Sequence, residues 1–401
     1  MTKILFIAYC HLRWEKNYCR EMYASLADVI ADKGCVLCVD RPFALIPDIF
    51  ICPIDLFKGL FQKRTCKIGE NIFLFKPIII IHDQIALFIT WINRLNRIIL
   101  KRQLLKYIKE LHREAHVFAH IIEPHQYAYL KLFDDEMSIY DCIAEWSSYP
   151  GVSLQEKVRI KRLETMTISA ADLVLAVSKE LCDRRKKVKD KVFYLPWAAE
   201  YKLFSRETGT SECSDILRIK KPYIGFIGNI WGIFDLNLIE HIAETMPDCS
   251  IILIGGLSRI LPKHFKENFD RICRIHNVHW LGTKDHSSLP DYLRYFNVCI
   301  MPYVIDDWIK TCSPGKFYQY LAQGKSIVAV DIPEVRKYDT DIVRIAKDYA
   351  DFTDKIRIGL SEKADDALLN KRKKIARENT WLERASKMVE LIKHADDQYN
   401  N

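Results

Sequence analysis

The fold is decided by residues 311–331, TCSPGKFYQYLAQGKSIVAVD, which predict a short helix that leads into a buried strand. Ser313 is a good N-cap, Pro314 suits the first helical position, and Gly324 is placed to end the helix in a left-handed conformation. Residues 326–330, SIVAV, are rich in the β-branched residues that strands favour. A bounded helix that feeds a buried strand is typical of an α/β domain with a parallel sheet.

The start of this helix is a candidate phosphate site. Backbone N–H groups at a helix start attract a diphosphate together with the positive end of the helix dipole, and Lys316 in the first turn adds a positive charge. One polar face of the helix is formed by residues at spacings of three and four, namely Lys316, Gln319, Tyr320 and Gln323. Phe317 and Leu321 lie on another face, which can pack on the sheet. An ordinary amphipathic helix with a solvated lysine is the alternative interpretation.

Length and composition indicate two folded domains. The chain has 401 residues, of which 49% are hydrophobic and 28% charged, and this length exceeds what one typical core supports. The net charge of +8 is modest for the size, so we expect no nucleic-acid partner. Residues 1–9 read as a first buried strand rather than a secretion signal, which predicts a cytoplasmic protein. The 13 scattered cysteines are expected to be reduced thiols, and Cys35 and Cys38 are not expected to hold a metal.

Strand-like and helical segments alternate along the chain, which predicts parallel sheets covered on both faces. The expected strands of a first domain, 1–200, lie at residues 3–9, 35–40, 77–82, 116–122, 138–143, 172–177 and 191–195. After a linker near residues 196–215, the pattern restarts in a second domain, 216–378, at residues 223–228, 249–255, 277–282, 297–302 and 326–330. Residues 379–401 predict a helix that packs back across the linker. We therefore expect two Rossmann-like domains that face a cleft.

A basic amphipathic helix is predicted at residues 88–113. Its apolar positions include Ile92, Leu95 and Ile99, and its basic ones Arg94, Arg97 and Lys101. This combination suits a helix on an anionic membrane surface, and a core-packed helix with a basic solvent face is the alternative. Since no uncharged run reaches the ~20 residues that span a bilayer, we expect a peripheral position on the inner face of the plasma membrane.

Several motifs, taken in order, carry a family resemblance. They are Tyr140–Gly151 (YDCIAEWSSYPG), Ala171–Ser178 (ADLVLAVS), Tyr223–Trp231 (YIGFIGNIW), Val278–Gly282 (VHWLG), Leu289–Leu293 (LPDYL), Met301–Tyr303 (MPY) and Ser313–Asp331. In this order and spacing the chain resembles bacterial GT-B glycosyltransferases of the teichuronic acid and xanthan glucuronosyltransferase type. The resemblance covers nearly the whole chain. It implies that the second domain binds a nucleotide sugar and that the first presents the acceptor.

The resemblance implies a set of donor-binding residues. Lys316 matches a phosphate-contacting lysine, and Gln319 matches a glutamine near the nucleoside. The full set of donor-binding candidates is Gly228, Asn229, Met301, Tyr303, Ser313, Gly315, Lys316 and Gln319. For Met301 and Tyr303, which could pack on the base, an ordinary core role is the alternative. Gly228 allows close approach of backbone to a diphosphate, although a simple tight turn is the alternative. Many relatives carry two glutamates where this chain has Thr311 and Gln319, and this departure weakens any inference of a retaining mechanism.

Glycosyl transfer also needs a group that deprotonates the acceptor hydroxyl. Glu145 is the first candidate base and Asp141 the second, since family members carry adjacent acids where this chain has Ala144-Glu145, while Lys316 holds the departing diphosphate. For each of these two acids, a structural role is the alternative to catalysis. The acceptor-side candidates are His11, Arg13, Trp14 and His125, for each of which an ordinary structural role stays open.

No metal is expected. The acidic clusters Asp134-Asp-Glu136 and Asp306-Asp307 are more typical of solvated loop ends than of a Mg²⁺ site. The resemblance favours metal-independent transfer, with lysine and helix terminus at the leaving group. The sequence thus predicts a glycosyltransferase that moves a sugar, most simply from a UDP-sugar, to a lipid-linked or growing glycan in bacterial surface polysaccharide synthesis. A nucleotide-sugar 2-epimerase and a catalytically silent sugar-nucleotide-binding partner are the alternatives.

Overall fold

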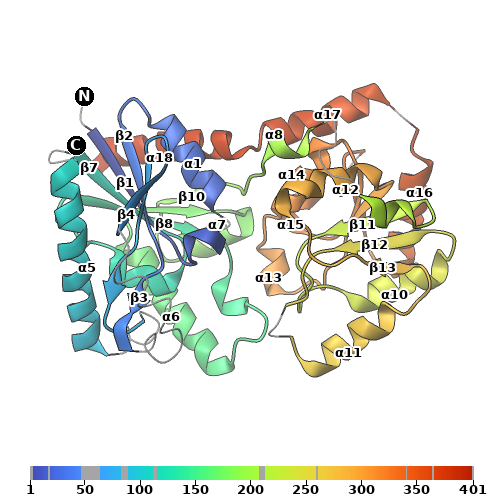
Figure 1. The fold of residues 1–401 in the computed structure, drawn as a ribbon, viewed down its shortest axis with the longest axis horizontal. Coiled ribbons are helices and arrows are strands. Elements are labelled where there is room, and N and C mark those ends of the chain that lie inside the picture. The colour runs from blue at the N-terminus through green and yellow to red at the C-terminus, as the bar shows by residue number, and fades with distance from the viewer. Residues whose placement is uncertain are drawn as a thin grey trace. The chain divides into compact units, whose positions relative to one another are not determined.

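The computed structural model describes residues 3–16, 19–46, 64–82, 89–111, 115–206, 213–258, 261–339, 341–363 and 365–399. The chain divides into two compact units, shown in Figure 1. Unit 1 comprises Met1–Ser147, Ser153–Leu195 and Trp381–Asn401, and unit 2 comprises Ser148–Val152 and Pro196–Thr380. The final helix of the chain is therefore part of the first unit.

Unit 1 is built on an eight-stranded sheet in the order β10-β9-β8-β7-β1-β2-β5-β4. The strands are β1 (Lys3–Tyr9), β2 (Gly34–Val39), β4 (Thr65–Gly69), β5 (Ile72–Phe75), β7 (Ala115–Ile121), β8 (Glu136–Cys142), β9 (Leu173–Ala176) and β10 (Val192–Tyr194). All pairings are parallel except that of β4 with β5. The chain order reverses between β1 and β7, and ligands of such sheets bind at the carboxyl ends of the strands beside this switch point.

The described helices of unit 1 include α1 (Arg20–Val29), α5 (Thr90–Leu111), α6 (Leu154–Ala170), α7 (Lys179–Lys186) and α18 (Trp381–Tyr399). Short 3-10 helices are η1 (Trp14–Lys16), η2 (Pro124–Tyr129) and η3 (Trp146–Ser148). In Figure 1, α1 and α18 run side by side over the sheet, and they are in contact. Two short strands, β3 (Phe43–Ala44) and β6 (Ile78–Ile79), pair with one another outside the main sheet.

Unit 2 has a six-stranded, fully parallel sheet in the order β13-β12-β11-β14-β15-β16. The strands are β11 (Tyr223–Ile227), β12 (Ser250–Ile254), β13 (Val278–Trp280), β14 (Val298–Met301), β15 (Ser326–Val330) and β16 (Arg344–Ala346). Numbered within the unit, this is the Rossmann order 3-2-1-4-5-6, with its switch point between β11 and β14. Both faces of β11, β12 and β14 are buried, as expected of a parallel sheet with helices on each side.

The helices of unit 2 are α8 (Tyr201–Phe204), α9 (Ser214–Leu217), α10 (Leu236–Thr245), α11 (Lys263–Ile272), α12 (Leu289–Tyr295), α13 (Asp307–Lys310), α14 (Gly315–Ala322), α15 (Pro333–Arg336), α16 (Tyr349–Ser361) and α17 (Asp366–Arg377), with the 3-10 helix η4 (His286–Ser288). The segment read as a linker contains α8 and α9, and Phe204 and Ile216 are buried in the core of unit 2. These two short helices were not predicted, because one buried apolar residue in each gives no hydrophobic periodicity in the sequence.

Most predicted strands are present within one or two residues of their expected bounds, and the exceptions have physical causes. The expected strand at 77–82 is reduced to β6, which lies outside the main sheet. The strands β3, β4, β5 and β16 were not predicted from the sequence. β4 is largely exposed and pairs antiparallel, so it carries no buried run and breaks the expectation of a wholly parallel sheet.

The helix predicted at 88–113 exists as α5, but its faces differ from the prediction. The Arg97 guanidinium points inward and donates to backbone carbonyls around η2, including that of Leu130 at 3.2 Å, so it is not part of a basic outer face. Ile92 is buried as expected, whereas Leu95 is 37% exposed. The outward apolar stripe consists of Trp91, Leu95 and Ile98, at 68, 37 and 40% exposure.

Candidate active site

Lys316 lies in the first turn of α14, at the carboxyl edge of the unit 2 sheet. The helix begins at Gly315, and its N-cap is Pro314, so the prediction of Ser313 as the cap was wrong by one residue. The Ser313 hydroxyl instead accepts a hydrogen bond from the backbone N–H of Trp197 at 3.1 Å. Gly315 lets the two segments approach closely, since a Cβ there would lie 2.9 Å from the Trp197 ring. The chain around Trp197 thus fixes the start of the helix.

The Lys316 side chain turns onto the strand ends rather than into solvent. Its ammonium donates to the Tyr303 hydroxyl at 2.5 Å and lies 4.5 Å from the centre of the Phe226 ring. A Cβ on Gly228 would lie 2.4 Å from Nζ, so only glycine leaves room for the ammonium at this turn. Lys316, Gly228 and Tyr303 therefore meet at the switch point between β11 and β14.

Burial lowers the pKa of Lys316 from 10.5 to about 8, and the nearby Cys312 acts weakly in the opposite direction. At neutral pH the group is a charged ammonium that has lost much of its hydration. An anion that replaces this missing hydration gains more than it would from a solvated lysine, because charge interactions strengthen as the local dielectric falls. The arrangement can hold a phosphate group.

The loop after β11 provides the open part of this edge. Gly228 adopts φ +151° and its N–H bonds to the carbonyl of Ile254 at 2.8 Å. Gly255, at the end of β12, has φ +144°, and a Cβ there would lie 2.0 Å from the Gly228 carbonyl oxygen. Asn229 follows Gly228 and is exposed. The two glycines let neighbouring strand ends pack tightly while Asn229 remains accessible.

The other predicted donor-binding residues differ in exposure. Gln319 is half-buried on α14, whereas Tyr320, expected on the same polar face, is fully buried and accepts a hydrogen bond from the backbone N–H of Ile227 at 3.0 Å. Met301 has no exposed surface, which corresponds to the core role left open for it, and Tyr303 is 4% exposed. Thr311, at one position of the missing glutamates, is also fully buried.

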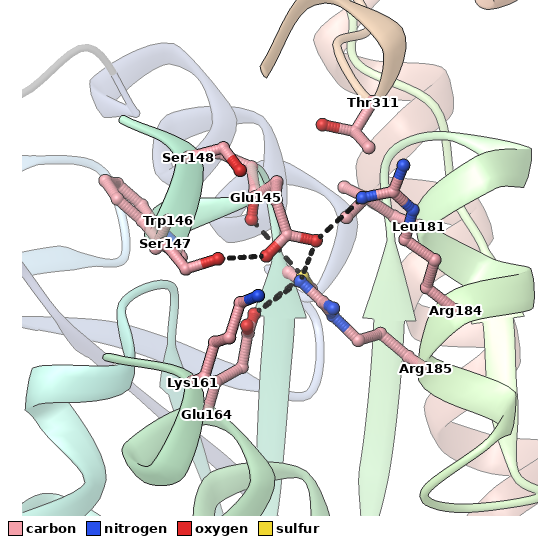
Figure 2. A network of polar contacts seen from close by, with 12 residues as sticks. Glu145, Trp146, Ser147, Ser148, Lys161, Glu164, Leu181, Arg184, Arg185 and Thr311 are labelled. Atoms are coloured by element: carbon pink, nitrogen blue, oxygen red, sulfur yellow. Dashed lines mark hydrogen bonds and ion pairs between the residues drawn. The ribbon is translucent and has the colours of Figure 1, made fainter. Parts of the chain in front are cut away.

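In unit 1, Glu145 belongs to the buried ion-pair network drawn in Figure 2. Its carboxylate lies 3.1 Å from Arg185 and 3.4 Å from Arg184, and it accepts a hydrogen bond from the Ser147 hydroxyl at 2.8 Å. Arg185 also contacts Glu164 at 2.9 Å. Both oxygens of Glu145 are thus engaged within unit 1. Neither arginine was predicted from the sequence as a partner of Glu145, because both lie about 40 residues away on α7.

Asp141 forms a buried ion pair with Arg384 of α18. Both oxygens accept from the same guanidinium nitrogen, at 2.9 and 2.8 Å, and His120 Nε2 lies 3.5 Å away. Burial alone would raise the pKa of Asp141, but Arg384 and His120 outweigh it and lower the pKa. Asp141 has no exposed surface. These contacts fasten α18 to the sheet, as the structural alternative for Asp141 expects, and its role as a base stays a prediction.

The acceptor-side candidates lie near the carboxyl ends of β1 and β7. Burial and the charge of Arg41 lower the pKa of His11 to about 4, so it is neutral at physiological pH. The Arg13 guanidinium stacks 3.8 Å from the centre of the Phe43 ring, and the Trp14 backbone N–H donates to Asp40. His125 lies in η2, and its pKa is lowered by burial.

One carboxylate at this edge, Glu123, was not among the candidates predicted from the sequence. Glu123 follows β7 after Ile122 and is the N-cap of η2, where its side chain accepts from the backbone N–H of Gln126 in a capping box. The sequence does indicate this position, because Glu123 and Pro124 end the apolar run 116–122. Ligands of doubly wound sheets bind at such strand ends.

In each of the two acidic clusters, at least one carboxylate is engaged by the backbone. Asp306 caps α13 and accepts from the Ile309 N–H at 2.8 Å, while Glu136 turns inward to accept from the Lys131 N–H at 2.8 Å. Among the described residues, no group of three or more histidine, cysteine or acidic side chains is arranged to hold a metal ion. Cys35 and Cys38 are both buried in β2. Within the same residues, no helix combines the length and apolarity required to cross a bilayer.

Comparisons with known proteins agree with this geometry. Residues 221–362, most of unit 2, match the family model described as "Glycosyl transferases group 1". The fold of the whole chain matches sucrose-phosphate synthase from Thermosynechococcus elongatus, with a TM-score of 0.68 at 15% identity over 99% of this chain and 100% of that one. The protein is a glycosyltransferase with the GT-B fold, as its motifs predicted.

Within that class, the chain is 27% identical over 280 residues to TuaH of Bacillus subtilis (strain 168), a protein provisionally named as a teichuronic acid biosynthesis glycosyltransferase. The match covers 66% of this chain and 69% of the relative. The fold also matches Anabaena HepE, solved in complex with UDP and glucose, with a TM-score of 0.61 at 14% identity over 98% of this chain and 100% of that one. A trehalose-6-phosphate enzyme from E. coli, solved with UDP-2-fluoro glucose, matches with a TM-score of 0.67 at 10% identity over 96 and 98% of the two chains.

Proposed function

We propose that this glycosyltransferase moves a sugar from a UDP-sugar to a lipid-linked or growing glycan in the synthesis of a bacterial surface polysaccharide. The observation that carries the proposal is the half-buried ammonium of Lys316, held against Gly228 at the switch point of the unit 2 sheet. Doubly wound sheets bind nucleotides at this point, and a poorly hydrated cation there suits the diphosphate of a nucleotide sugar.

Two lines of support concern the substrates. HepE and the E. coli enzyme were solved with UDP or a UDP-sugar, which favours UDP over other nucleotides as the donor carrier. The provisional naming of TuaH for teichuronic acid biosynthesis favours a surface polymer as the product. We propose that Asn229 and Gln319, exposed and half-buried at the same edge as Lys316, contact the donor.

Lys316 stabilises the departing diphosphate in this proposal, so transfer needs no metal ion. The negative charge that develops on the leaving oxygen is met by the ammonium in a partly dehydrated site. Activity should therefore survive a chelator. Loss of transfer with EDTA, and its recovery on adding Mg²⁺, would contradict the assignment of Lys316 as the cation at the leaving group.

Contact with the membrane is proposed through the outer face of α5. Trp91, Leu95 and Ile98 form its exposed apolar stripe, and the exposed Arg94 and Arg102 flank it. Apolar side chains between arginines suit the interface of an anionic bilayer, where tryptophan is favoured.

The membrane proposal has a matched test. Wild type should sediment together with vesicles of phosphatidylglycerol and phosphatidylcholine. The Trp91→Asp variant should stay in the supernatant, because a charged carboxylate does not enter the membrane interface as the indole ring does. Ile358→Asp is the control, since Ile358 is 54% exposed on α16 of unit 2 and belongs to no such stripe. Equal sedimentation of all three proteins would remove α5 as the contact.

One alternative has a specific observation behind it. The two glutamates common in relatives are replaced by Thr311 and Gln319, and Thr311 is buried with its hydroxyl bonded to the carbonyls of Asp307 and Trp308. A catalytically silent protein that binds a sugar nucleotide is consistent with this loss. It would bind UDP-sugar and catalyse no transfer.

Thermal-shift measurements with UDP, GDP, TDP and their sugars test the donor class first. A ligand at about 100 times its dissociation constant stabilises by about 2.7 kcal/mol, a shift of several degrees for a domain of this size. The active donor is then incubated with a bacterial lipid extract, and release of UDP is followed. Stabilisation by UDP-sugars together with UDP release supports the proposal. Binding without release supports the silent protein, and isomerised UDP-sugar in the absence of extract supports an epimerase.

A further inference from the structure

Three aromatic side chains gather beyond the switch point of the unit 2 sheet. Trp231 lies in the loop after β11, Trp308 lies in α13 after β14, and Tyr149 comes from the segment Ser148–Val152 of the same unit. The ring centre of Tyr149 is 5.2 Å from that of each tryptophan, and the two tryptophan rings are 5.7 Å apart. All three side chains are half-buried, so part of each ring is accessible. Tyr149, Trp231 and Trp308 form the aromatic cluster.

The ring geometry and the backbone hold the aromatic cluster together. The Trp308 ring stands at 86 and 88° to the other two, the edge-to-face arrangement that aromatic pairs prefer. The loops after β11 and β14 are hydrogen-bonded to one another, since the Val304 N–H donates to the Ile233 carbonyl at 2.9 Å. The Phe234 N–H donates to the Trp231 carbonyl at 2.8 Å. The two loops that flank the switch point therefore fix the positions of both tryptophans.

The same two loops carry the contacts of the Lys316 ammonium. Gly228 and Tyr303 meet this ammonium, and Trp231 and Trp308 follow them along the chain. An extended chain advances by at most about 3.6 Å per residue, so the Cα atom of Trp231 lies within roughly 11 Å of that of Gly228. A saccharide joined to a diphosphate at Lys316, or approaching it, thus comes within reach of the aromatic cluster.

A carboxylate completes the chemistry that a sugar ring requires. One face of a pyranose ring carries C–H groups that pack on an aromatic ring, while its hydroxyls need hydrogen-bond partners. Asp307 is exposed beside Trp308, and its carboxylate accepts from the Ser148 hydroxyl at 3.1 Å. A carboxylate accepts several hydrogen bonds at once. Aromatic surface with a few polar groups is typical of small-molecule sites.

A membrane is the other surface that aromatic residues suit. Val304 and Ile305, which precede α13, are 46 and 38% exposed, and such apolar side chains near tryptophan occur at bilayer interfaces. Asp306 and Asp307 follow them directly, however, where contact with an anionic bilayer would favour lysine or arginine. The charges therefore favour a saccharide over a lipid surface.

We propose that the aromatic cluster and Asp307 bind a pyranose ring, with its C–H face on the aromatic rings and its hydroxyls on the carboxylate. This inference rests on the proposed function, whose reaction brings two saccharides together, that of the donor and that of the acceptor glycan. The shared chemistry is the pyranose ring, and the experiment distinguishes its two sources. These four residues bind and orient the sugar, and none of them takes or gives a proton.

The test compares two quantities in the full chain at pH 7. Calorimetry gives the affinities for UDP and for UDP-glucose, and UDP release gives the concentration of a bacterial lipid extract that supports half of the maximal rate. Trp308→Leu removes the aromatic ring, and Trp308→Phe restores one. Trp280→Leu is the matched control, because Trp280 is 41% exposed on the edge strand β13 of the same unit and packs on Phe269 instead of the aromatic cluster.

The two sources of the ring give different results. If the aromatic cluster holds the donor sugar, Trp308→Leu weakens UDP-glucose binding about tenfold and leaves the affinity for UDP unchanged. If it holds the acceptor glycan, both affinities stay and the half-maximal extract concentration rises about tenfold. In either case Trp308→Phe recovers most of the loss, and Trp280→Leu leaves the ratio of the UDP-glucose and UDP affinities as in wild type.

Asp307→Asn should weaken the same quantity by a smaller factor, and as a change at an exposed residue it decides the question if Trp308→Leu does not fold. A Trp308→Leu protein that binds UDP and UDP-glucose as wild type does, with an unchanged or absent dependence on extract, overturns the inference and leaves the proposed function standing. A wild type that binds neither UDP nor UDP-glucose overturns the proposed function itself.

Discussion

Replacing Lys316 with methionine should affect donor binding and stability in opposite directions. Methionine keeps the length of the side chain and its contact with Phe226 but removes the ammonium. A hydrogen bond to a charged group contributes about 1.5–3 kcal/mol, so loss of the contact with the diphosphate weakens UDP-sugar binding by roughly 10- to 150-fold. Isothermal calorimetry at pH 7 measures this change directly.

The same substitution should stabilise the free protein at pH 7. The pKa of Lys316 in the folded state, about 8, lies below its ordinary 10.5, so folding disfavours the charged form. Wild type carries this whole penalty below pH 8, and it disappears as the pH rises to about 10.5. Lys316→Met should therefore raise the free energy of unfolding by roughly 1–3 kcal/mol at pH 7, with a smaller gain at pH 10.

Lys325 provides the matched control. It is another lysine whose pKa is lowered by burial, but its ammonium donates to the carbonyls of Arg294 and Phe296. Lys325→Met should destabilise, since two buried carbonyls lose their partner, and it should leave donor binding unchanged. The reasoning is refuted if Lys316→Met binds UDP-sugar normally, or if it destabilises at pH 7 as Lys325→Met does.

Two further substitutions test particular contacts. Gly228→Ala should abolish detectable UDP-sugar binding and destabilise the protein by about 1–3 kcal/mol, because its Cβ meets the Lys316 ammonium at a positive φ. Gly282→Ala is the control, since Gly282 has φ +68° and open space around its Cβ. It should show only the cost of the backbone strain and should keep UDP-sugar binding. Arg384→Met should destabilise by about 3–5 kcal/mol in urea at pH 7, since it leaves Asp141 buried without its partner. The pKa of Asp141 is lowered in the folded state, so the contribution of this pair is present above pH 4 and vanishes as the pH falls further. If the loss of unfolding free energy in Arg384→Met stayed constant down to pH 2, this account of the ion pair would be wrong.

The sequence predicted the unit 2 sheet well because its strands are buried on both faces. β11, β12, β14 and β15 carry continuous apolar runs, and glycine marks the ends of β11 and β12. Such runs need no long-range information to be recognised. Lys316 and Gly228, each singled out from the sequence as a donor-binding candidate, lie side by side because a helix start and a strand end meet at the carboxyl edge of one parallel sheet.

What the sequence could not supply was the pairing of charges across long separations. Glu145 and Asp141 were singled out as acids near a strand end, but their arginine partners lie on α7 and α18, about 40 and 240 residues away. Whether an acid is neutralised or accessible depends on those partners. Arg97 shows the same limit, because helical periodicity placed it on a basic face while tertiary contacts turned it to backbone carbonyls.

The ion pair between Asp141 and Arg384 also bears on the order in which the molecule can be made. A ribosome synthesises all of unit 2 before it reaches α18, so the nascent first unit lacks the guanidinium that neutralises its buried acid. Until then Asp141 must remain hydrated or bind a proton, and the surface of α1 that α18 covers stays open. The earliest-translated unit is thus expected to be the last to reach its final stability, and a nascent chain stalled before residue 381 should be a substrate for chaperones and proteases.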